Sequence, residues 1–401
     1  MKNGRSVGLV IACLAVLFML FSSPVFAQQG KDDFKWPPML RIATPTTQSA
    51  SFAATNGWAP LLRNDVGVNV RVVPEDSELR RYMRFVLSKE FELASISSAE
   101  GAASTEGHDG YKTQRAQATR ITWFQNDTPW SYAVRGDSEL QTVYDLKKKG
   151  VRVAVASQSP PMTIGVQEAL PAFLGWTKEE AAANWTFVPT GSYPDNCRTI
   201  PDGRADIAYL TPISSISFEM EAHPKGLRWI ALPLEDTEGW ARFLEIRPMA
   251  VPITIDFGAK SSIGTDAIGS AFLYYTRPDV DQEMIYRMAK WFDQSFDTYK
   301  DVHATAKRMS LSHFRKFLDT SPLPVAEGTI RYLREIGQWT EADDQWNNEA
   351  IALMDRWVAA RNAAIDEAEA KKVRIHFENQ EYLDIFNKHI EGIPVFKTRL
   401  Q

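Results

Sequence analysis

The sequence has few of the residues that usually mark a redox or metal site. Only two of its 401 residues are cysteine, and Cys13 lies in an apolar stretch near the N-terminus. Cys197 has no CxxC partner, which excludes a dithiol redox pair, and we expect it to be a small buried residue. The six histidines show no ligand spacing such as H-E-x-x-H. We therefore expect no bound metal.

The glycine motifs that bind phosphates and nucleotides are also missing. No two glycines are separated by a single residue, so there is no G-x-G-x-x-G, and no G-x-x-x-x-G-K-[ST] occurs. Gly191-Ser192 lacks the G-x-S-x-G pattern of a hydrolase nucleophile. We accordingly expect no cofactor and no catalytic residue.

Residues 1–27 have the pattern of a cleaved secretory signal peptide. Lys2 and Arg5 precede an uncharged run at 7–21, and Val25-Phe26-Ala27 is an acceptable cleavage site. Removing this segment takes away two basic residues and no acidic one, which changes the net charge from −5 to −7. A negative chain argues against a nucleic-acid or anionic-membrane surface. An exported chain that keeps one cysteine fits the bacterial periplasm.

Three stretches of the chain recur later in the same order. They are 40–49 with 151–159, 70–77 with 185–192, and 91–97 with 206–211. Each half of the chain therefore contains three strands, and each strand ends in a polar loop. The loop after the second strand has the form Pro-x-x-Ser, and helical stretches lie between the strands. The pattern predicts an α/β fold of two lobes, with a ligand held in the cleft between their polar strand ends.

We expect two crossings between the lobes. Strand-like segments at 130–134 and 249–255 would carry the chain across and back, which is suited to hinged closure. The predicted domains are lobe I, made of 28–134 plus 250–401 with the C-terminal helices and tail, and lobe II, made of 135–249.

Helical periodicity is clear in several places. After Ser77, an expected N-cap, apolar residues follow the 3.6-residue period, and Arg80, Arg81 and Arg84 are expected to face solvent. Amphipathic helices are also predicted at 282–298, 310–318, 329–336 and, from a Thr340–Asp343 capping box, to about residue 372. The tail at 373–401 is expected to hold one short strand and one short helix.

The loop after the strand at 151–155 is a candidate anion site. It leads to a helix expected to open near Thr163, and a helix N-terminus presents unpaired N–H groups that attract carboxylate or phosphate. The alternative is an ordinary strand-to-helix turn. We expect a ligand carboxylate to meet amides and hydroxyls of this loop and of the matching loop in lobe I. The full set of predicted ligand-binding residues is Thr44, Thr46, Thr47, Gln48, Ser49, Phe52, Glu75, Asp76, Ser77, Ser97, Ser157, Gln158, Ser159, Thr163, Tyr209, Thr211 and Ser214.

The two Pro-x-x-Ser loops differ in charge. The first carries Glu75 and Asp76, whereas the second has Thr190 and Gly191 in the matching positions. Two carboxylates at the edge of a cleft would favour an ammonium group or several hydroxyls and would repel a second carboxylate. The alternative is that both acids face water beside the N-terminus of a helix, where its dipole favours them.

Four segments together resemble one known family. They are 40–44 (LRIAT), 145–155 (DLKKKGVRVAV), 201–206 (PDGRAD) and 321–337 (SPLPVAEGTIRYLREIG). The chain resembles the TAXI branch of TRAP-transporter solute-binding proteins over roughly residues 39–340. It departs from the family pattern at 49–56, 157–163 and 325–329.

The resemblance implies a periplasmic-binding-protein-like fold and a receptor that delivers a small organic acid or amino acid to a TRAP-type membrane permease. We expect a monomer without nucleic-acid partners. Two alternatives stay open, namely a non-transport ligand sensor or interaction protein and an enzyme built on the same two-lobed fold.

Overall fold

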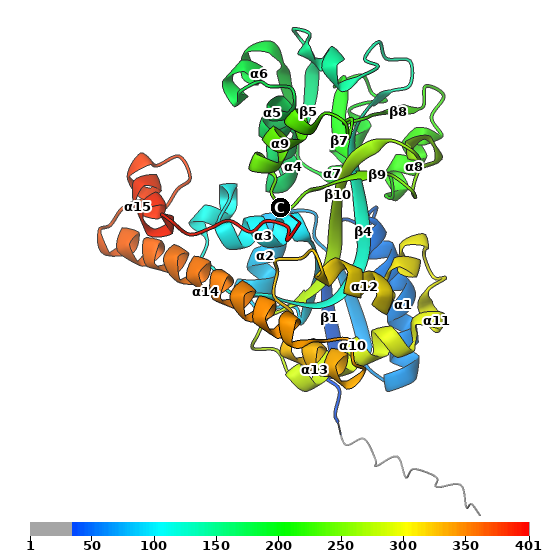
Figure 1. Cartoon of the computed structure of the whole chain (residues 1–401), viewed down its shortest axis with the longest axis vertical. Coiled ribbons are helices and arrows are strands. Elements are labelled where there is room, and N and C mark those ends of the chain that lie inside the picture. The colour runs from blue at the N-terminus through cyan, green and yellow to red at the C-terminus, as the bar shows by residue number, and fades with distance from the viewer. Residues whose placement is uncertain (1–33, 401) are drawn as a thin grey trace, which may run out of the picture. The chain divides into compact units, whose positions relative to one another are not determined.

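The computed structural model describes residues 34–400, so the signal peptide expected at 1–27 lies outside the described residues. Within 34–400, ten strands form one mixed sheet in the order β2-β1-β3-β10-β4-β7-β5-β6, with β8 paired to β4 and β9 paired to β10 (Figure 1). The strands are β1 (Met39–Thr44), β2 (Asn69–Pro74), β3 (Leu93–Ser97), β4 (Arg120–Arg135), β5 (Arg152–Ala156), β6 (Thr186–Thr190), β7 (Ile207–Leu210), β8 (Leu227–Ile230), β9 (Val251–Thr254) and β10 (Asp266–Thr276).

Helices connect the strands and form the C-terminal part of the chain. They are α1 (Ala50–Val66), α2 (Glu78–Tyr82), α3 (Ser98–Glu106), α4 (Pro160–Ile164), α5 (Leu170–Phe173), α6 (Lys178–Asn184), α7 (Tyr193–Arg198), α8 (Ser215–Glu221), α9 (Thr237–Ile246), α10 (Gln282–Gln294), α11 (Phe296–Tyr299), α12 (Leu311–Leu318), α13 (Glu327–Glu335), α14 (Glu341–Ala370) and α15 (Gln380–Ile390). None of these helices in the described part of the chain combines the length and the apolar character needed to cross a membrane.

The sheet has two halves of similar design. In lobe I, β1 is parallel to β2 and β3, and β10 runs antiparallel to β3. In lobe II, β5 is parallel to β6 and β7, while β4 runs antiparallel to β7 and β8. Helices α4 to α9 surround the sheet of lobe II, and the remaining helices lie around lobe I (Figure 1). The predicted α/β fold of two lobes is confirmed.

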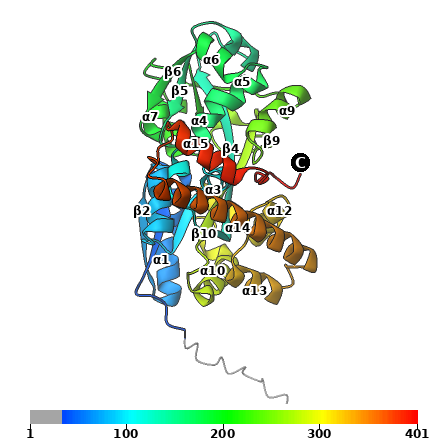
Figure 2. The same ribbon diagram turned by 90° about the vertical axis from the view of Figure 1, so that its left-hand side faces the viewer.

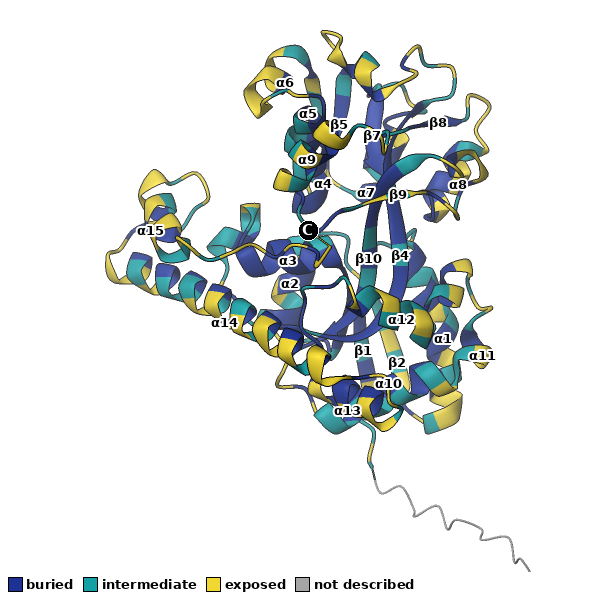
Figure 3. Cartoon of the chain, viewed as in Figure 1, coloured by how far each residue is buried: buried dark blue, intermediate teal, exposed yellow. Residues whose placement is uncertain are grey.

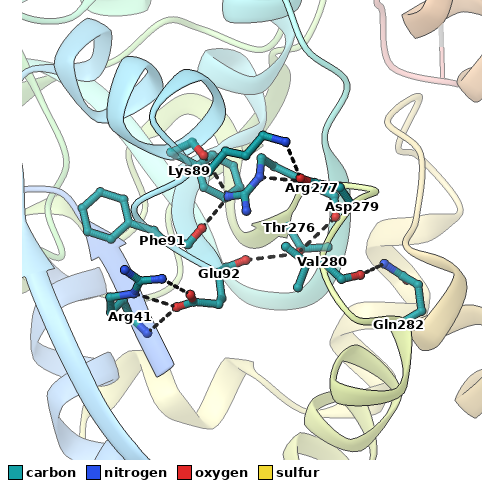
Figure 4. Close-up of polar contacts among 10 residues, drawn as sticks. Arg41, Lys89, Phe91, Glu92, Thr276, Arg277, Asp279, Val280 and Gln282 are labelled. Carbon is teal, nitrogen blue, oxygen red and sulfur yellow. Dashed lines mark hydrogen bonds and ion pairs between the residues drawn. The ribbon is translucent and has the colours of Figure 1, made fainter. Parts of the chain in front are cut away.

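The internal repeat is visible in one ion pair that occurs in both lobes. In lobe I the main-chain N–H of Arg41 donates to Glu92, whose carboxylate also binds the guanidinium of Arg41 (Figure 4). In lobe II the main-chain N–H and the guanidinium of Arg152 bind Asp206 in the same way. Arg41 is the third residue of β1 and Arg152 is the first residue of β5, and each acid immediately precedes the third strand of its lobe. The echo in the sequence therefore reflects a repeated packing arrangement.

Both connections between the lobes are strands of the shared sheet. β4 pairs with β10 over residues 120–130 and with β7 and β8 over 131–135. The return expected at 249–255 forms β9, which contains Pro252 and pairs with β10. The chain therefore returns through β9 and then β10, which corrects the expectation of a single strand at 249–255.

The pairing of β10 with β4 is irregular between Phe272 and Leu273 and again between Tyr274 and Tyr275. The exact lobe boundaries stay a prediction.

The core of lobe I contains a cluster of aromatic rings between the sheet and the helices. Trp58 of α1 meets the ring of Tyr274 edge-on at 5.7 Å, and Phe292 of α10 stacks on Tyr274 at 5.4 Å. The Trp58 indole N–H donates to the Tyr274 hydroxyl at 2.9 Å. These contacts fix α1 and α10 against β10, since buried aromatic side chains contribute large apolar contact areas.

The C-terminal helices follow the predicted pattern. α14 begins at Glu341 behind the Thr340–Asp343 capping box, and it presents one buried and one exposed face (Figure 3). Figure 2 shows α14 and α15 lying beside α3. In the tail, α15 is the expected short helix, whereas the expected short strand is not formed in the residues described between 373 and 400.

The last residues of the tail return to the body of the protein. The Phe396 N–H donates to the Glu106 carboxylate at 2.6 Å, and the Thr398 N–H donates to the Pro248 carbonyl at 3.0 Å. The Arg399 guanidinium donates to the Leu318 carbonyl at 3.0 Å. The tail thereby contacts α3, the segment that follows α9, and α12.

Candidate functional site

A pocket lies where the strand ends of the two lobes meet. Its cavity volume is about 80 Å³, and one side of it is open to solvent. Its floor is formed by alternate residues of the two long strands, Asn126, Thr128 and Trp130 of β4 with Ser270 and Phe272 of β10. Since side chains alternate between the faces of a strand, this spacing places them on one face of the sheet.

The structure brings about half of the predicted residues into the pocket. Those that line it are Thr46, Ser49, Asp76, Ser97, Gln158, Ser159, Tyr209, Thr211 and Ser214. Those that the pocket lining does not include are Thr44, Thr47, Gln48, Phe52, Glu75, Ser77, Ser157 and Thr163. The first group contains members from both lobes, as expected for a cleft between polar strand ends.

The predicted serines are N-caps of the helices that start at the pocket. The hydroxyl oxygens of Ser49, Ser97 and Ser214 each accept a hydrogen bond from the main-chain N–H three residues on. Ser159 caps α4 in the same way, and Ser77, outside the pocket, caps α2. These hydroxyls therefore have a structural role, since N-cap bonds satisfy helix N–H groups that otherwise lack partners. The Ser159 hydroxyl in turn donates its proton to the Glu78 carboxylate at 2.7 Å.

The predicted anion site at 157–163 does not have the expected geometry. α4 begins at Pro160, not near Thr163, and neither Pro160 nor Pro161 has an N–H group. The N–H of Met162 is bound by the Ser159 hydroxyl, and the N–H of Thr163 by the Ser159 carbonyl. The Thr163 hydroxyl donates to the Ala156 carbonyl at 3.1 Å. The first turn of this helix therefore offers a ligand no free N–H group.

The two acids of the first Pro-x-x-Ser loop have different surroundings. The Glu75 carboxylate lies 3.4 Å from the guanidinium of Arg84 and 3.8 Å from that of Arg80, outside the pocket. Asp76 lines the pocket and accepts a hydrogen bond from the Tyr193 N–H of lobe II at 3.0 Å. Burial raises the pKa of Asp76 above its ordinary value, although the bond from Tyr193 opposes the rise. Only Asp76 is therefore placed to contact a ligand.

Three charged residues that line the pocket were not predicted. Glu78, Arg81 and Arg247 all line it. Arg81 was expected to face solvent, but it is 1% exposed and forms an ion pair with Glu100 of α3, which is equally buried. The expectation fails because α3 packs over this side of α2, a contact that the periodicity of α2 alone does not reveal. Arg80, by contrast, is exposed as predicted.

Arg247 reaches the pocket from the segment after α9. Its guanidinium donates to the Pro161 carbonyl at 2.7 Å. It passes so close to Gly165 that a Cβ at that position would lie 2.9 Å from Nη1. Because glycine has no Cβ, residue 165 leaves room for the Arg247 guanidinium.

Several polar atoms of the pocket have no hydrogen-bond partner within the described residues. They are Glu78 Oε2, Arg81 Nε, Asn126 Oδ1, Tyr209 OH and both polar atoms of the Gln158 amide. Buried polar groups in folded proteins nearly always have partners, because an unpartnered group costs about 1–3 kcal/mol. Donors and acceptors are both present, so the set suits a ligand that carries both kinds of group.

Aromatic rings form one wall of the pocket. Trp130 stacks on Tyr209 at 5.2 Å and meets Tyr193 edge-on at 6.3 Å. Cys197, one helical turn after Tyr193 on α7, is fully buried as predicted, and burial raises the pKa of its thiol to about 12. Among residues 34–400, no group of three or more His, Cys, Asp or Glu side chains could hold a metal ion.

A model of the NMT1-like family matches residues 42–337, which is most of the chain. The chain belongs to the NMT1-like family. The match to this NMT1-like protein ends before α14, so the two C-terminal helices lie beyond it. No curated protein matches its sequence.

Solved structures that resemble this NMT1-like protein share little sequence with it. The binding-protein component of an ABC phosphonate transporter from Pseudomonas aeruginosa has 11% identity and a TM-score of 0.46, over 83% of this chain and 99% of the other. PhnD1 from Prochlorococcus marinus, in complex with methylphosphonate, has 10% identity and a TM-score of 0.45, over 76% and 100%. MatC from Rhodopseudomonas palustris, with bound malate, has 8% identity and a TM-score of 0.45, over 79% and 100%.

Proposed function

We propose that this NMT1-like protein is a periplasmic solute-binding receptor that captures a small organic acid or amino acid and delivers it to a TRAP-type membrane permease. The observation that carries the proposal is the pocket between the lobes, in which buried arginines lie beside polar atoms that have no partner among residues 34–400. The sequence resemblance to the TAXI branch supports the choice of permease.

The charges of the pocket favour an acid. Arg247 and Arg81 place two guanidinium groups at the site, and the unpartnered Nε of Arg81 is available to a carboxylate oxygen. Hydrogen bonds between arginine and a carboxylate are among the stronger ones in proteins, at roughly 1.5–3 kcal/mol each. We expect the ligand carboxylate to lie between these two residues rather than at the first turn of α4.

The acceptors of the pocket favour a second, proton-donating group on the ligand. Within the described part of the chain, Asn126 Oδ1 and Gln158 Oε1 accept no hydrogen bond, and the Asp76 carboxylate lines the same pocket. A ligand hydroxyl or ammonium group would satisfy them, whereas a second carboxylate would leave them unpaired and would be repelled by Asp76. The pocket therefore suits an amino acid or a hydroxylated monoacid better than a plain dicarboxylate.

A comparison of simple acids tests this ligand class. L-alanine and L-lactate should raise the melting temperature more than succinate does at equal concentration, because a ligand that binds only the folded state stabilises it by mass action. Asn126→Ala should weaken their binding roughly tenfold, since it removes an acceptor from the pocket floor. Asn56→Ala, which changes an exposed residue of α1, should not. Stabilisation by succinate above both other acids would contradict the proposed ligand class.

The permease assignment is tested by transport. Liposomes that contain a TRAP-type permease should accumulate the bound acid only when the receptor is added, because the proposed role of the receptor is to deliver its solute to the membrane subunits. Mass spectrometry of small molecules released from the denatured protein identifies the acid to be used. Uptake that proceeds equally without the receptor, or binding of the acid without any delivery, would favour the non-transport alternative.

A further inference from the structure

Glu78 links the two lobes at the pocket. Its main-chain N–H donates to the Gln158 carbonyl of lobe II at 3.1 Å, and its Oε1 accepts a hydrogen bond from the Ser159 hydroxyl at 2.7 Å. Its second carboxyl oxygen, Oε2, is buried, lines the pocket and has no partner among the described residues. This oxygen is therefore available to a ligand.

The charged neighbours of Glu78 do not neutralise it. Arg81, on the same helix, donates a hydrogen bond from Nη2 to the Glu100 carboxylate of α3 and one from Nη1 to the Glu75 carbonyl. Arg247, from the segment after α9, donates to the Pro161 carbonyl. The other titratable groups that face this cluster are the buried Tyr111 hydroxyl, from the 3₁₀ segment 109–113, the Asp76 carboxyl group and the Tyr209 hydroxyl. No hydrogen bond from an arginine to Glu78 occurs within residues 34–400, and Glu100 adds a second negative charge nearby.

Burial raises the pKa of Glu78 well above its ordinary value, and the Glu100 carboxylate adds to the rise. Arg81, the Ser159 hydroxyl and Arg247 oppose it without reversing it. A carboxyl group whose charged form is disfavoured by burial keeps its proton and can then act as a hydrogen-bond donor.

We propose that Glu78 enters the ligand complex as a neutral carboxylic acid and donates the hydrogen on Oε2 to an anionic oxygen of the bound acid. The inference rests on the proposed function. The proton comes from solvent before the pocket closes and stays on Glu78, and the ligand keeps its charge. An ionised Glu78 would instead repel the ligand carboxylate at close range. Glu78 would thus make capture of an acid dependent on pH.

Binding and its pH dependence test the proposal. The affinity for L-lactate, whose charge is constant between about pH 5 and about pH 8, should fall toward tenfold per pH unit once the pH exceeds the pKa of Glu78. Glu78→Gln retains an acceptor for Ser159 and a donor in place of Oε2–H, so its affinity should not vary with pH over this range. Glu75→Gln, three residues away and outside the pocket, should keep the pH dependence of the wild type.

A second readout needs no ligand. Because the folded pKa of Glu78 is raised above its unfolded value of about 4.3, the folded state holds the proton more tightly than the unfolded state. This contribution to stability is fully present below the unfolded pKa and is lost as the pH rises toward the folded pKa. The melting temperature of the wild type should therefore fall relative to that of Glu78→Gln over the same pH range.

The outcomes separate the two proposals. If lactate, alanine and succinate all fail to bind at any pH, the proposed ligand class fails, and the ligand-free comparison still decides whether Glu78 holds a proton. If lactate binds and the wild type and Glu78→Gln show parallel pH profiles in both readouts, the proposed role of Glu78 is wrong.

If Glu78→Gln fails to fold, calorimetry of lactate binding to the wild type, in two buffers of different ionisation enthalpy, measures the proton uptake instead. Proton uptake on lactate binding should rise with pH, and no uptake at any pH would overturn the proposal.

Discussion

Replacing Arg361 with methionine should lower the free energy of unfolding by about 3–5 kcal/mol, one of the largest effects expected in this protein. Arg361 lies in the middle of α14, is 1% exposed, and points its guanidinium into the turn that follows α3. It donates to four main-chain carbonyls, those of Ser104, Thr105, Tyr111 and Gln114. Methionine fills a similar volume but has no donor, so these buried carbonyls lose their partner.

Arg356→Met is the matched control for this prediction. Arg356 lies on the same helix, is exposed, and makes only a long contact of 3.5 Å with the Gly392 carbonyl. Urea unfolding should show a change of less than about 0.5 kcal/mol for this variant, as is usual for surface positions. Equal losses in the two variants would mean that helix propensity, and not the buried guanidinium, decides the result.

Replacing Gly328 with alanine should destabilise the protein by roughly 3 kcal/mol, through overpacking. Gly328 lies in the first turn of α13, against the first turn of α10. A Cβ there would lie 2.3 Å from the main-chain oxygen of Gln282 and 2.6 Å from the main-chain nitrogen of Tyr286. Both atoms belong to the backbone of α10, so no side-chain rotation relieves the contact and the two helices must separate.

Gly191→Ala tests whether close approach is the cause. A Cβ at Gly191 would meet no atom within 4 Å, and its φ is not in the left-handed region. Thermal unfolding should leave this variant within a few degrees of the wild type, whereas Gly328→Ala should melt well below it. A Gly328→Ala protein that is as stable as the wild type would show that α10 and α13 can move apart at little cost.

The fold could be predicted because its signals are local and repeated. Three matched segments identify the two lobes, and the pairs Arg41–Glu92 and Arg152–Asp206 show why the segments match. Helix starts with a serine or threonine cap were also visible in the sequence, as at Thr340. The return crossing was harder, because it is shared by two consecutive strands, β9 and β10, each of which contains an apolar run.

The candidate site was predicted where it depends on strand ends and missed where it depends on packing. Loop residues such as Asp76 and Ser159 follow directly from strand positions. Arg81 resembles a surface residue until α3 covers it, and Arg247 comes from a distant segment with no motif around it. The lack of free N–H groups in the first turn of α4 can be predicted from the sequence, because Pro160 and Pro161 have no main-chain N–H. The alternation of Asn126, Thr128 and Trp130 along β4 is a second signal of the pocket in the sequence.

The two long strands have a mechanical consequence. β4 and β10 form a hydrogen-bonded ribbon that both lobes share, so the lobes can open only by twisting this ribbon and cannot swing on slack linkers. Twist concentrates where a ladder is already irregular. One such irregularity lies between Phe272 and Leu273, and Phe272 and its partner Asn126 both line the pocket floor. A solute bound on that floor would resist twisting of β4 against β10. Ligand binding would therefore make the whole shared sheet more rigid.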